Sequence, residues 1–156
     1  MAKEANAQTK VKVEVESIWK AVAKDLRFIA PKILPSKVKS VEVLEGDGFS
    51  VGSIMRFNFV PDISPRGYQN EKVVELDEER HRVGLQVVEA GRFDIGFKAF
   101  KITYQFTAQG EKETLVDINL AYEMNEGATE IPAEDLLKSP LTVMQCFEDF
   151  LTAQNK

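Results

Sequence analysis

The sequence predicts an α+β domain in which a curved antiparallel sheet packs against one long C-terminal helix. Six strand-like segments follow one another, and the short turns between them favour antiparallel neighbours. One strand and two short helical segments precede them, and a long segment of helical periodicity follows them. The length of 156 residues suits one domain, so residues 1–156 are assigned to a single domain.

The first part of the chain is expected to form a strand and then two short helices. Polar and apolar side chains alternate up to Val15, which predicts a strand over residues 4–15. Helical spacing of apolar residues predicts a helix at Ser17–Asp25. A second helix is expected at Phe28–Leu34, with Pro31 and Pro35 limiting its length.

The central part of the chain is expected to supply six strands. They are placed at Val38–Leu44, Ile54–Val60, Tyr68–Leu76, Arg82–Glu89, Phe97–Ala108 and Thr114–Tyr122. Alternate side chains of most strands are apolar, so one face of the sheet should be buried and the other solvated. The Tyr68–Leu76 strand is ambiguous, because Gln69, Glu71 and Glu75 share a face with Val73. Periodicity alone favours an edge strand whose acidic face is solvated.

The C-terminal segment over residues 131–153 is predicted to be an amphipathic helix. Its apolar stripe consists of Leu137, Leu141, Met144, Phe147 and Leu151. Pro140 removes one backbone donor from this helix and is expected to bend it. A helix that packs loosely on the concave face of the sheet would leave a cavity between them.

Composition excludes several classes of protein and leaves one question open. The net charge of −5 disfavours binding to a phosphate backbone. Cys146 is the one cysteine, which suits a reducing compartment, and no segment is apolar enough for a signal peptide or a membrane span. We expect a cytoplasmic monomer or weak dimer that binds neither nucleic acid nor membranes. The 10 phenylalanines indicate either a dense core or an aromatic-lined cavity.

Five short segments together resemble a known family. They are PKILP at Pro31–Pro35, VLEGDG at Val43–Gly48, FNFVP at Phe57–Pro61, YQ at Tyr68–Gln69 and GLQVVE at Gly84–Glu89. In this order they resemble the birch-pollen-allergen family of plant pathogenesis-related proteins, over essentially the whole chain. The branch of cytokinin-specific and phytohormone-binding proteins is the most similar. The resemblance implies a helix-grip fold: a seven-stranded antiparallel sheet around a C-terminal helix, two short helices after the first strand, and a large hydrophobic cavity.

The resemblance also implies a binding site for a small hydrophobic plant molecule, with no cofactor and no metal. Gln69 and Glu71 would point into the cavity and hydrogen-bond the ligand, and burial would raise the pKa of Glu71. The expected wall consists of Phe57, Phe59, Leu85, Phe100, Tyr104, Val143, Met144 and Phe147. Val143 stands where cytokinin-binding relatives have a tyrosine, so the helical wall should lack that hydroxyl contact. This departure favours a bulkier ligand, such as a gibberellin-like diterpenoid or an alkaloid, over a cytokinin.

Two other functions remain open at this stage. Some relatives are norcoclaurine synthases, whose chemistry resembles acid–base catalysis by a cavity lysine and glutamate. Glu71 matches the glutamate, but the lysine position falls near Val83–Gly84, where no amine exists. A different enzyme of alkaloid metabolism, with proton transfer by Glu71 and Tyr104, remains an alternative. The third hypothesis is a mainly structural protein whose cavity is nearly filled by phenylalanine.

Three further features have mainly structural interpretations. The glycine-rich segment Gly46–Gly52 could bind phosphate, but no Gly-Lys-Ser/Thr follows it, so a turn with positive φ angles is favoured. It also has Phe49 or Ser50 where the family has its middle glycine. His81 lies in a charged turn and is expected to be solvated, and Cys146 is expected to be an ordinary helix residue. One histidine and one cysteine leave no spacing typical of a metal site.

Overall fold

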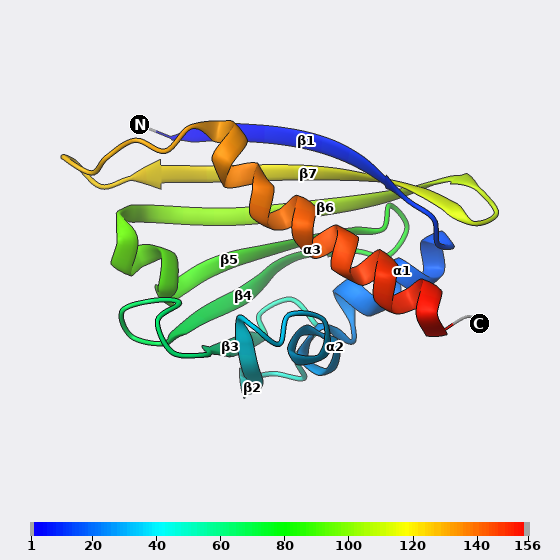
Figure 1. Cartoon of the computed structure of the whole chain (residues 1–156), viewed down its shortest axis with the longest axis horizontal. Coiled ribbons are helices and arrows are strands. Elements are labelled where there is room, and N and C mark those ends of the chain that lie inside the picture. Colours follow the sequence, from blue (N-terminus) through cyan, green and yellow to red (C-terminus); the bar gives the residue numbers. More distant parts are fainter. Residues whose placement is uncertain (1, 155–156) are drawn as a thin grey trace.

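A seven-stranded antiparallel sheet curves around one long helix in the computed structural model, which describes residues 2–154 (Figure 1). The strands are β1 (Lys3–Val11), β2 (Val38–Glu45), β3 (Ile54–Phe59), β4 (Tyr68–Asp77), β5 (Arg82–Ala90), β6 (Phe97–Gly110) and β7 (Glu113–Met124). Their order in the sheet is β1-β7-β6-β5-β4-β3-β2, so β1 and β2 form the two edges. The predicted α+β fold class is confirmed.

Four helical segments complete the fold. They are α1 (Val15–Ala23), α2 (Leu26–Ile33), the 3₁₀ helix η1 (Gly91–Ile95) and α3 (Ala133–Gln154). Helix α3 crosses the concave face of the sheet obliquely, and α1 and α2 lie at one end of this face (Figure 1). Within residues 2–154, no helix has both the length and the apolar character needed to cross a membrane.

The first strand is shorter than predicted and the first helix begins earlier. The last ladder pair of β1 joins Val11 to Thr114, and β7 begins only at Glu113, so the chain beyond Val11 has no strand to pair with. Helix α1 begins at Val15 instead, with the Glu14 carbonyl accepting hydrogen bonds from the amides of Ser17 and Ile18. Alternation of side chains alone therefore overestimated the strand by four residues.

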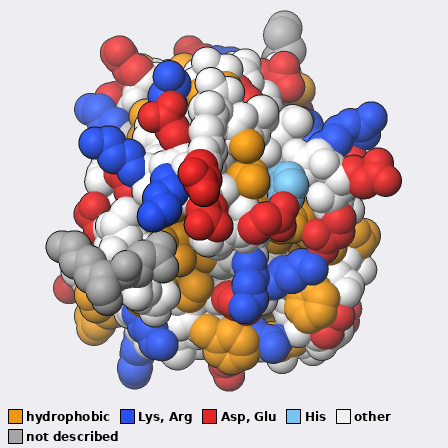
Figure 2. Space-filling view, turned by 90° about the vertical axis from the view of Figure 1, so that its right-hand side faces the viewer, with side chains coloured by type: hydrophobic (Ala, Val, Ile, Leu, Met, Phe, Trp, Pro, Cys, Tyr) orange, Lys and Arg blue, Asp and Glu red, His pale blue; other side chains and the backbone are white. Residues whose placement is uncertain are grey.

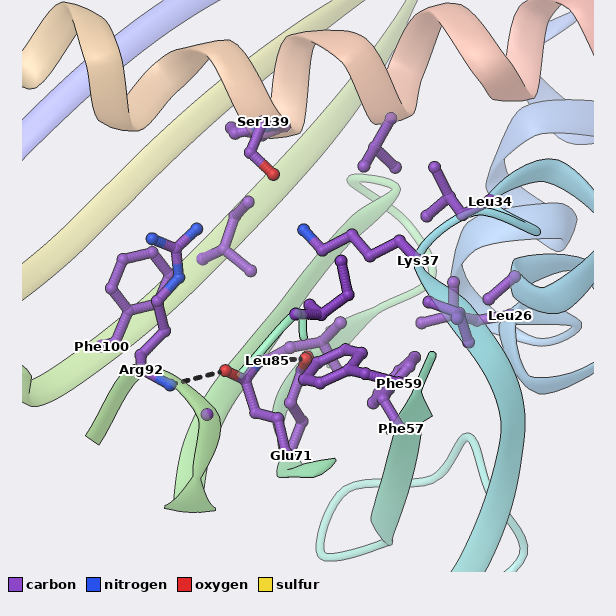
Figure 3. A pocket seen from close by; sticks show the side chains of 18 of the residues that line it. Leu26, Leu34, Lys37, Phe57, Phe59, Glu71, Leu85, Arg92, Phe100 and Ser139 are labelled. Atoms are coloured by element: carbon purple, nitrogen blue, oxygen red, sulfur yellow. Dashed lines mark hydrogen bonds between the residues drawn. The ribbon is translucent and has the colours of Figure 1, made fainter. Parts of the chain in front are cut away.

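One prediction about a proline and one about a turn also need correction. Helix α2 runs through Pro31 and ends at Ile33, so only Pro35 lies beyond its end. The short connection predicted between Arg82–Glu89 and Phe97–Ala108 is not a simple turn, because it contains the 3₁₀ helix η1 over Gly91–Ile95. This helix directs the side chain of Arg92 toward the interior, which a solvated turn would not do (Figure 3).

Strand β4 is an interior strand, and its alternation is interrupted. It pairs with both β3 and β5, so the edge-strand interpretation is wrong. A register shift between Val73 and Glu75 reverses the side-chain parity. Val73 is 2% exposed on the inner face, whereas Glu75 lies outside and forms ion pairs with Arg82 and Lys101. Leu76 then packs against the interior, contrary to the strict two-residue period.

The apolar interior is divided into three clusters. The first surrounds Trp19, Phe106 and Phe147, near α1 and the C-terminal half of α3. The second contains Phe97 and other side chains of β5, β6, β7 and the start of α3. The third lies beneath α2 and joins the inner faces of β2 to β5. Only Ile102 packs against all three among the described residues, so the interior does not close into one continuous core.

Helix α3 is held at its sides rather than against the middle of the sheet. Its main backbone neighbours are β1, α1 and α2. The five interior strands, β3 to β7, are therefore not among the main backbone neighbours of the helix. Only side chains can span the distance between α3 and these strands, and a cavity remains where those side chains are too short.

The face seen in Figure 2 has interspersed acidic and basic side chains with several apolar areas between them. A binding surface for a nucleic acid requires a continuous basic stripe, which this face does not show.

The end of β5 contains a strained residue. Ala90 has φ 61° and ψ −162°, a combination that is normally restricted to glycine, and its side chain is fully buried. The next residue, Gly91, also has a positive φ of 56°. A Cβ atom at Gly91 would overlap the Gln69 side-chain oxygen, so the glycine is needed for Gln69 to pack against this turn.

We therefore predict that Ala90→Gly leaves the free energy of unfolding unchanged or raises it by up to about 1 kcal/mol, because relief of strain offsets the lost methyl contact. The matched control is Ala5→Gly, at a buried alanine of β1 with an ordinary backbone, which should cost about 1 kcal/mol. Urea denaturation measures both. Equal destabilisation of the two variants would contradict the strain at Ala90.

Candidate functional site

A cavity of about 370 Å³ lies between the sheet, α2 and α3. All ten residues proposed from the sequence line it: Phe57, Phe59, Gln69, Glu71, Leu85, Phe100, Tyr104, Val143, Met144 and Phe147. They come from β3, β4, β5, β6 and α3, which the fold brings around one space. Its volume lies within the range of small-molecule pockets, about 300–1,000 Å³. The cavity is therefore large enough for one small organic molecule.

Gln69 and Glu71, adjacent side chains of the cavity lining, form its polar floor; Figure 3 shows Glu71 at this position. Gln69 Nε2 donates a hydrogen bond of 2.8 Å to Glu71 Oε2, and the backbone N–H of Arg92 donates one of 3.0 Å to Gln69 Oε1. The amide of Gln69 is thus oriented by η1 and in turn fixes the carboxylate. Burial raises the pKa of Glu71, against the opposing effects of the Gln69 hydrogen bond, Arg92 and Lys37.

Lys37 and Arg92 are two cavity residues that sequence reasoning missed. Lys37 lies in the α2–β2 connection and Arg92 in η1, and both reach into the cavity above Glu71 (Figure 3). Burial lowers the pKa of each, and the repulsion between the two cations lowers that of Lys37 further. No strand or helix period applies in these two short segments, so no pattern in the sequence indicates where their side chains point.

The helical wall carries a hydroxyl group after all. Val143 lines the cavity as expected, without a polar atom in its side chain. One turn earlier on α3, however, Ser139 also lines it, and its hydroxyl points down toward Lys37 and Arg92 (Figure 3). Val143 thus brings no hydroxyl group to this wall, but Ser139 on the same helix brings one.

Tyr104 supplies a further polar group to the opposite wall. Its side chain is 6% exposed and lines the cavity. Burial and the nearby Glu71 raise the pKa of its phenol far above the ordinary value, so the hydroxyl stays protonated and acts as a hydrogen-bond donor or acceptor.

The mouth of the cavity lies between the β3–β4 loop and η1. Ile63 of that loop and Ile95 of η1 both line the cavity, yet they are 41% and 49% exposed. Arg66 and Asp94 connect the same two segments, with Arg66 Nη2 2.7 Å and Nε 2.9 Å from the two carboxylate oxygens. Apolar side chains thus form the rim, and an ion pair ties its two sides together.

The phenylalanines divide between lining and packing roles. Four of them line the cavity: Phe57, Phe59, Phe100 and Phe147. Phe97 and Phe106 are each 1% exposed and belong to the packed clusters without lining the cavity. Phe106 packs edge-on against Trp19, with ring centroids 6.2 Å apart. The rings therefore surround the cavity and do not fill it.

The glycine-rich segment is a self-contained turn. Gly46, Gly48 and Gly52 all have positive φ angles. The Asp47 carboxylate accepts hydrogen bonds from the amides of Phe49 and Ser50, at 2.9 and 2.7 Å, and from the Ser50 hydroxyl at 2.6 Å. These bonds hold the pKa of Asp47 well below its usual range. The chain's own carboxylate thus occupies the donors that a phosphate would need.

His81 and Cys146 lie outside the cavity lining. His81 Nε2 is 2.7 Å from Glu16 Oε1, and its ring packs edge-on against Trp19 at 5.3 Å. Cys146 is a partly buried residue of α3. No group of three histidine, cysteine or acidic side chains within residues 2–154 is arranged to hold a metal ion.

Comparison with known proteins gives consistent relatives. A profile of the "Pathogenesis-related protein Bet v 1 family" matches residues 1–153. A norbelladine synthase from Narcissus pseudonarcissus is 28% identical over 121 residues, which cover 76% of this chain and 73% of that protein. The major latex-like protein 151 from Panax ginseng has a similar structure, with a TM-score of 0.80 and 25% identity over 96% of this chain and 97% of that one.

A norcoclaurine synthase from Thalictrum flavum also has the same fold. That structure, in complex with dopamine and hydroxybenzaldehyde, superposes with a TM-score of 0.77. It is 21% identical, and the match covers 98% of this chain and 88% of that chain. At this level of identity the comparison establishes the fold of the chain alone.

The raised pKa of Glu71 leads to a prediction about stability. Between the ordinary glutamate pKa of about 4.3 and the raised one, the unfolded chain loses its proton first, so the folded state binds more protons and stability falls as pH rises. Glu71→Gln removes this effect. We expect the stability of the variant relative to wild type to increase from about pH 4 to neutral pH, as measured by urea denaturation. The exposed Glu111→Gln is the control, and a pH-independent difference for Glu71→Gln would contradict the prediction.

Proposed function

The chain belongs to the pathogenesis-related protein Bet v 1 family, and on this premise we propose that it binds one small, mainly apolar plant molecule in its internal cavity. The observation that carries the proposal is the combination of apolar walls with a polar floor. Phenylalanine, leucine, valine and methionine side chains line most of the 370 Å³, while Gln69 and Glu71 lie together on β4. Few, fixed polar groups in an apolar space are typical of small-molecule sites.

The two kinds of lining residue would have different roles in binding. Apolar contact supplies affinity at about 25 cal/mol per Å² buried, before the costs of association. Gln69 offers two donors and an acceptor, and Glu71 accepts hydrogen bonds when ionised. The hydrogen bonds that hold these two side chains in place reduce the ordering cost when a ligand binds.

We propose a phytohormone or a related fused-ring metabolite as the ligand, with gibberellin favoured over cytokinin. Val143 on α3 makes an apolar contact where cytokinin-binding relatives have a hydroxyl group, which favours a bulkier apolar body. A cytoplasmic location as a monomer or weak dimer, with no nucleic acid or membrane partner, remains part of this proposal; the single cysteine and the net charge of −5 support it.

An enzymatic function is the second candidate, and Lys37 is the observation that favours it. The lysine expected for norcoclaurine-synthase-like chemistry is absent near Val83–Gly84, but the amine of Lys37 enters the same cavity from the α2–β2 connection. With its lowered pKa, this amine suits proton transfer alongside Glu71 and Tyr104. Condensation of an amine with an aldehyde is the reaction class that we propose for this candidate.

The binding proposal is tested by calorimetric titration with a gibberellin and a cytokinin. Glu71→Ala should weaken a ligand with a facing hydrogen-bond donor by about 1–3 kcal/mol, because it removes a buried acceptor. Glu75→Ala, on the outer face of the same strand, is the matched control and should leave affinity unchanged. Equal affinity of wild type and Glu71→Ala would show that Glu71 does not contact the ligand.

The enzymatic candidate is tested with dopamine and hydroxybenzaldehyde as substrates. Loss of turnover in Glu71→Gln and Lys37→Met, with substrate binding retained, would favour an enzyme. Binding without turnover in the wild-type protein would leave ligand binding as the function of the cavity.

A further inference from the structure

The charged groups of the cavity are unbalanced. Among its lining residues, Lys37 and Arg92 are cations and Glu71 is the one carboxylate. The cavity therefore has a formal excess of one positive charge, or of two when Glu71 is protonated. The whole protein carries a net charge of −5, so this excess is a local property of the cavity.

Neither cation has a close counter-ion in the part of the chain that the structure describes. The amine of Lys37 and the guanidinium of Arg92 take part in no ion pair and no side-chain hydrogen bond with residues 2–154. Other partly buried arginines of the sheet differ in this respect. Arg82 Nε lies 2.8 Å from Glu75 Oε2, and an Arg56 nitrogen lies 4.0 Å from Glu89 Oε1. The isolation of the two cavity cations is thus not general for this protein.

Glu71 is not a close counter-ion for either Lys37 or Arg92. Its carboxylate accepts a hydrogen bond of 2.8 Å from Gln69, and it acts on Lys37 and Arg92 only as a charge at longer range. Burial lowers the pKa of both cations in spite of Glu71, so their charged forms are under-stabilised in the cavity. An anion bound between the two cations would compensate for the hydration that their charged groups lose on burial.

The geometry places the two cations around one position. Lys37 enters from the α2–β2 connection and Arg92 from η1, and the two side chains approach each other beneath the Ser139 hydroxyl of α3 (Figure 3). The Arg92 guanidinium lies 4.6 Å from the centre of the Phe100 ring, which supports it against the wall. A guanidinium, an ammonium and a hydroxyl thus face one space from three elements.

We propose that the preferred ligands of this cavity are organic anions: molecules with an apolar ring body and one acidic group, such as a carboxylate, bound between Lys37 and Arg92. Arg92 offers paired N–H donors that match the two oxygens of such a group, and Lys37 adds a compact positive charge. The ring body lies on the aromatic wall, and a hydrogen-bond donor elsewhere on the ligand faces Glu71. This inference rests on the proposed binding function and specifies the chemistry of its ligand.

Two dyes with the same ring skeleton separate the contribution of the apolar cavity to binding from that of the acidic group. N-phenylnaphthylamine is neutral, and anilinonaphthalene sulfonate carries one anionic group. Their fluorescence on titration into the full chain gives both dissociation constants. In Lys37→Met and in Arg92→Met, we expect the sulfonate dye to bind roughly ten- to a hundredfold more weakly, while the neutral dye changes less than about twofold.

Lys39→Met is the matched control, because it removes the same charge from an exposed residue two positions along the chain. It should leave both dyes unaffected. A thermal unfolding curve for each variant shows whether the fold is kept. Glu71→Gln supplies a test with the opposite sign: removing the one cavity carboxylate should tighten the sulfonate dye several-fold.

The outcomes distinguish the two levels of the proposal. An equal loss of both dyes in the lysine and arginine variants, or no loss of either, overturns the anion preference while the binding function stands. Weaker binding of the sulfonate dye to Glu71→Gln also contradicts it. If neither dye binds the wild-type protein, the proposed binding function fails, and the anion preference fails with it.

Discussion

The structure depends on a mismatch between one helix and the wide, curved sheet that surrounds it. Helix α3 is anchored by β1, α1 and α2, and the five interior strands, β3 to β7, are not among its main backbone neighbours. The apolar side chains consequently form three clusters around a hollow rather than one core. Closing the hollow would require larger side chains in the gap or a helix drawn toward β4, which its contacts with the sheet edge and the two short helices oppose. The cavity is thus a consequence of the architecture.

The two cations of the cavity come from irregular segments at its edge. The turn from β5 into η1 uses a strained Ala90 and a glycine at position 91, and this turn both fixes Gln69 and delivers Arg92. The α2–β2 connection delivers Lys37 from the other side. Strands give a rigid apolar wall, whereas the connections supply cations that a regular inner strand face would exclude. Specificity for a ligand would therefore reside mainly in two short segments that make up only a small part of the fold.

The periodicity of the sequence predicted most of the fold and the apolar inner face of the sheet, whereas the cavity was implied by the family resemblance. Inner-face parity correctly located Phe57, Phe100 and Leu85, because burial of one sheet face imposes a two-residue period. The same rule failed at Glu75, because a register shift is a property of strand pairing and leaves no periodic signal. Lys37 and Arg92 were missed for a related reason, since turns impose no period on their side chains. The family resemblance, rather than the pattern, indicated which way Glu71 points.

The central claim is that the space enclosed by these rings is the binding site, and a cavity-filling variant tests it most directly. Val143 lies on the helical wall, so the larger side chain of Val143→Trp should occupy part of the 370 Å³ and strongly weaken binding of a neutral fluorescent probe such as N-phenylnaphthylamine. Val143→Ala, which enlarges the same space, should retain binding. The measurement is a fluorescence titration of both variants beside the wild-type protein, with circular dichroism to confirm folding. Undiminished affinity in a folded Val143→Trp variant would contradict the account, because the probe would then bind elsewhere.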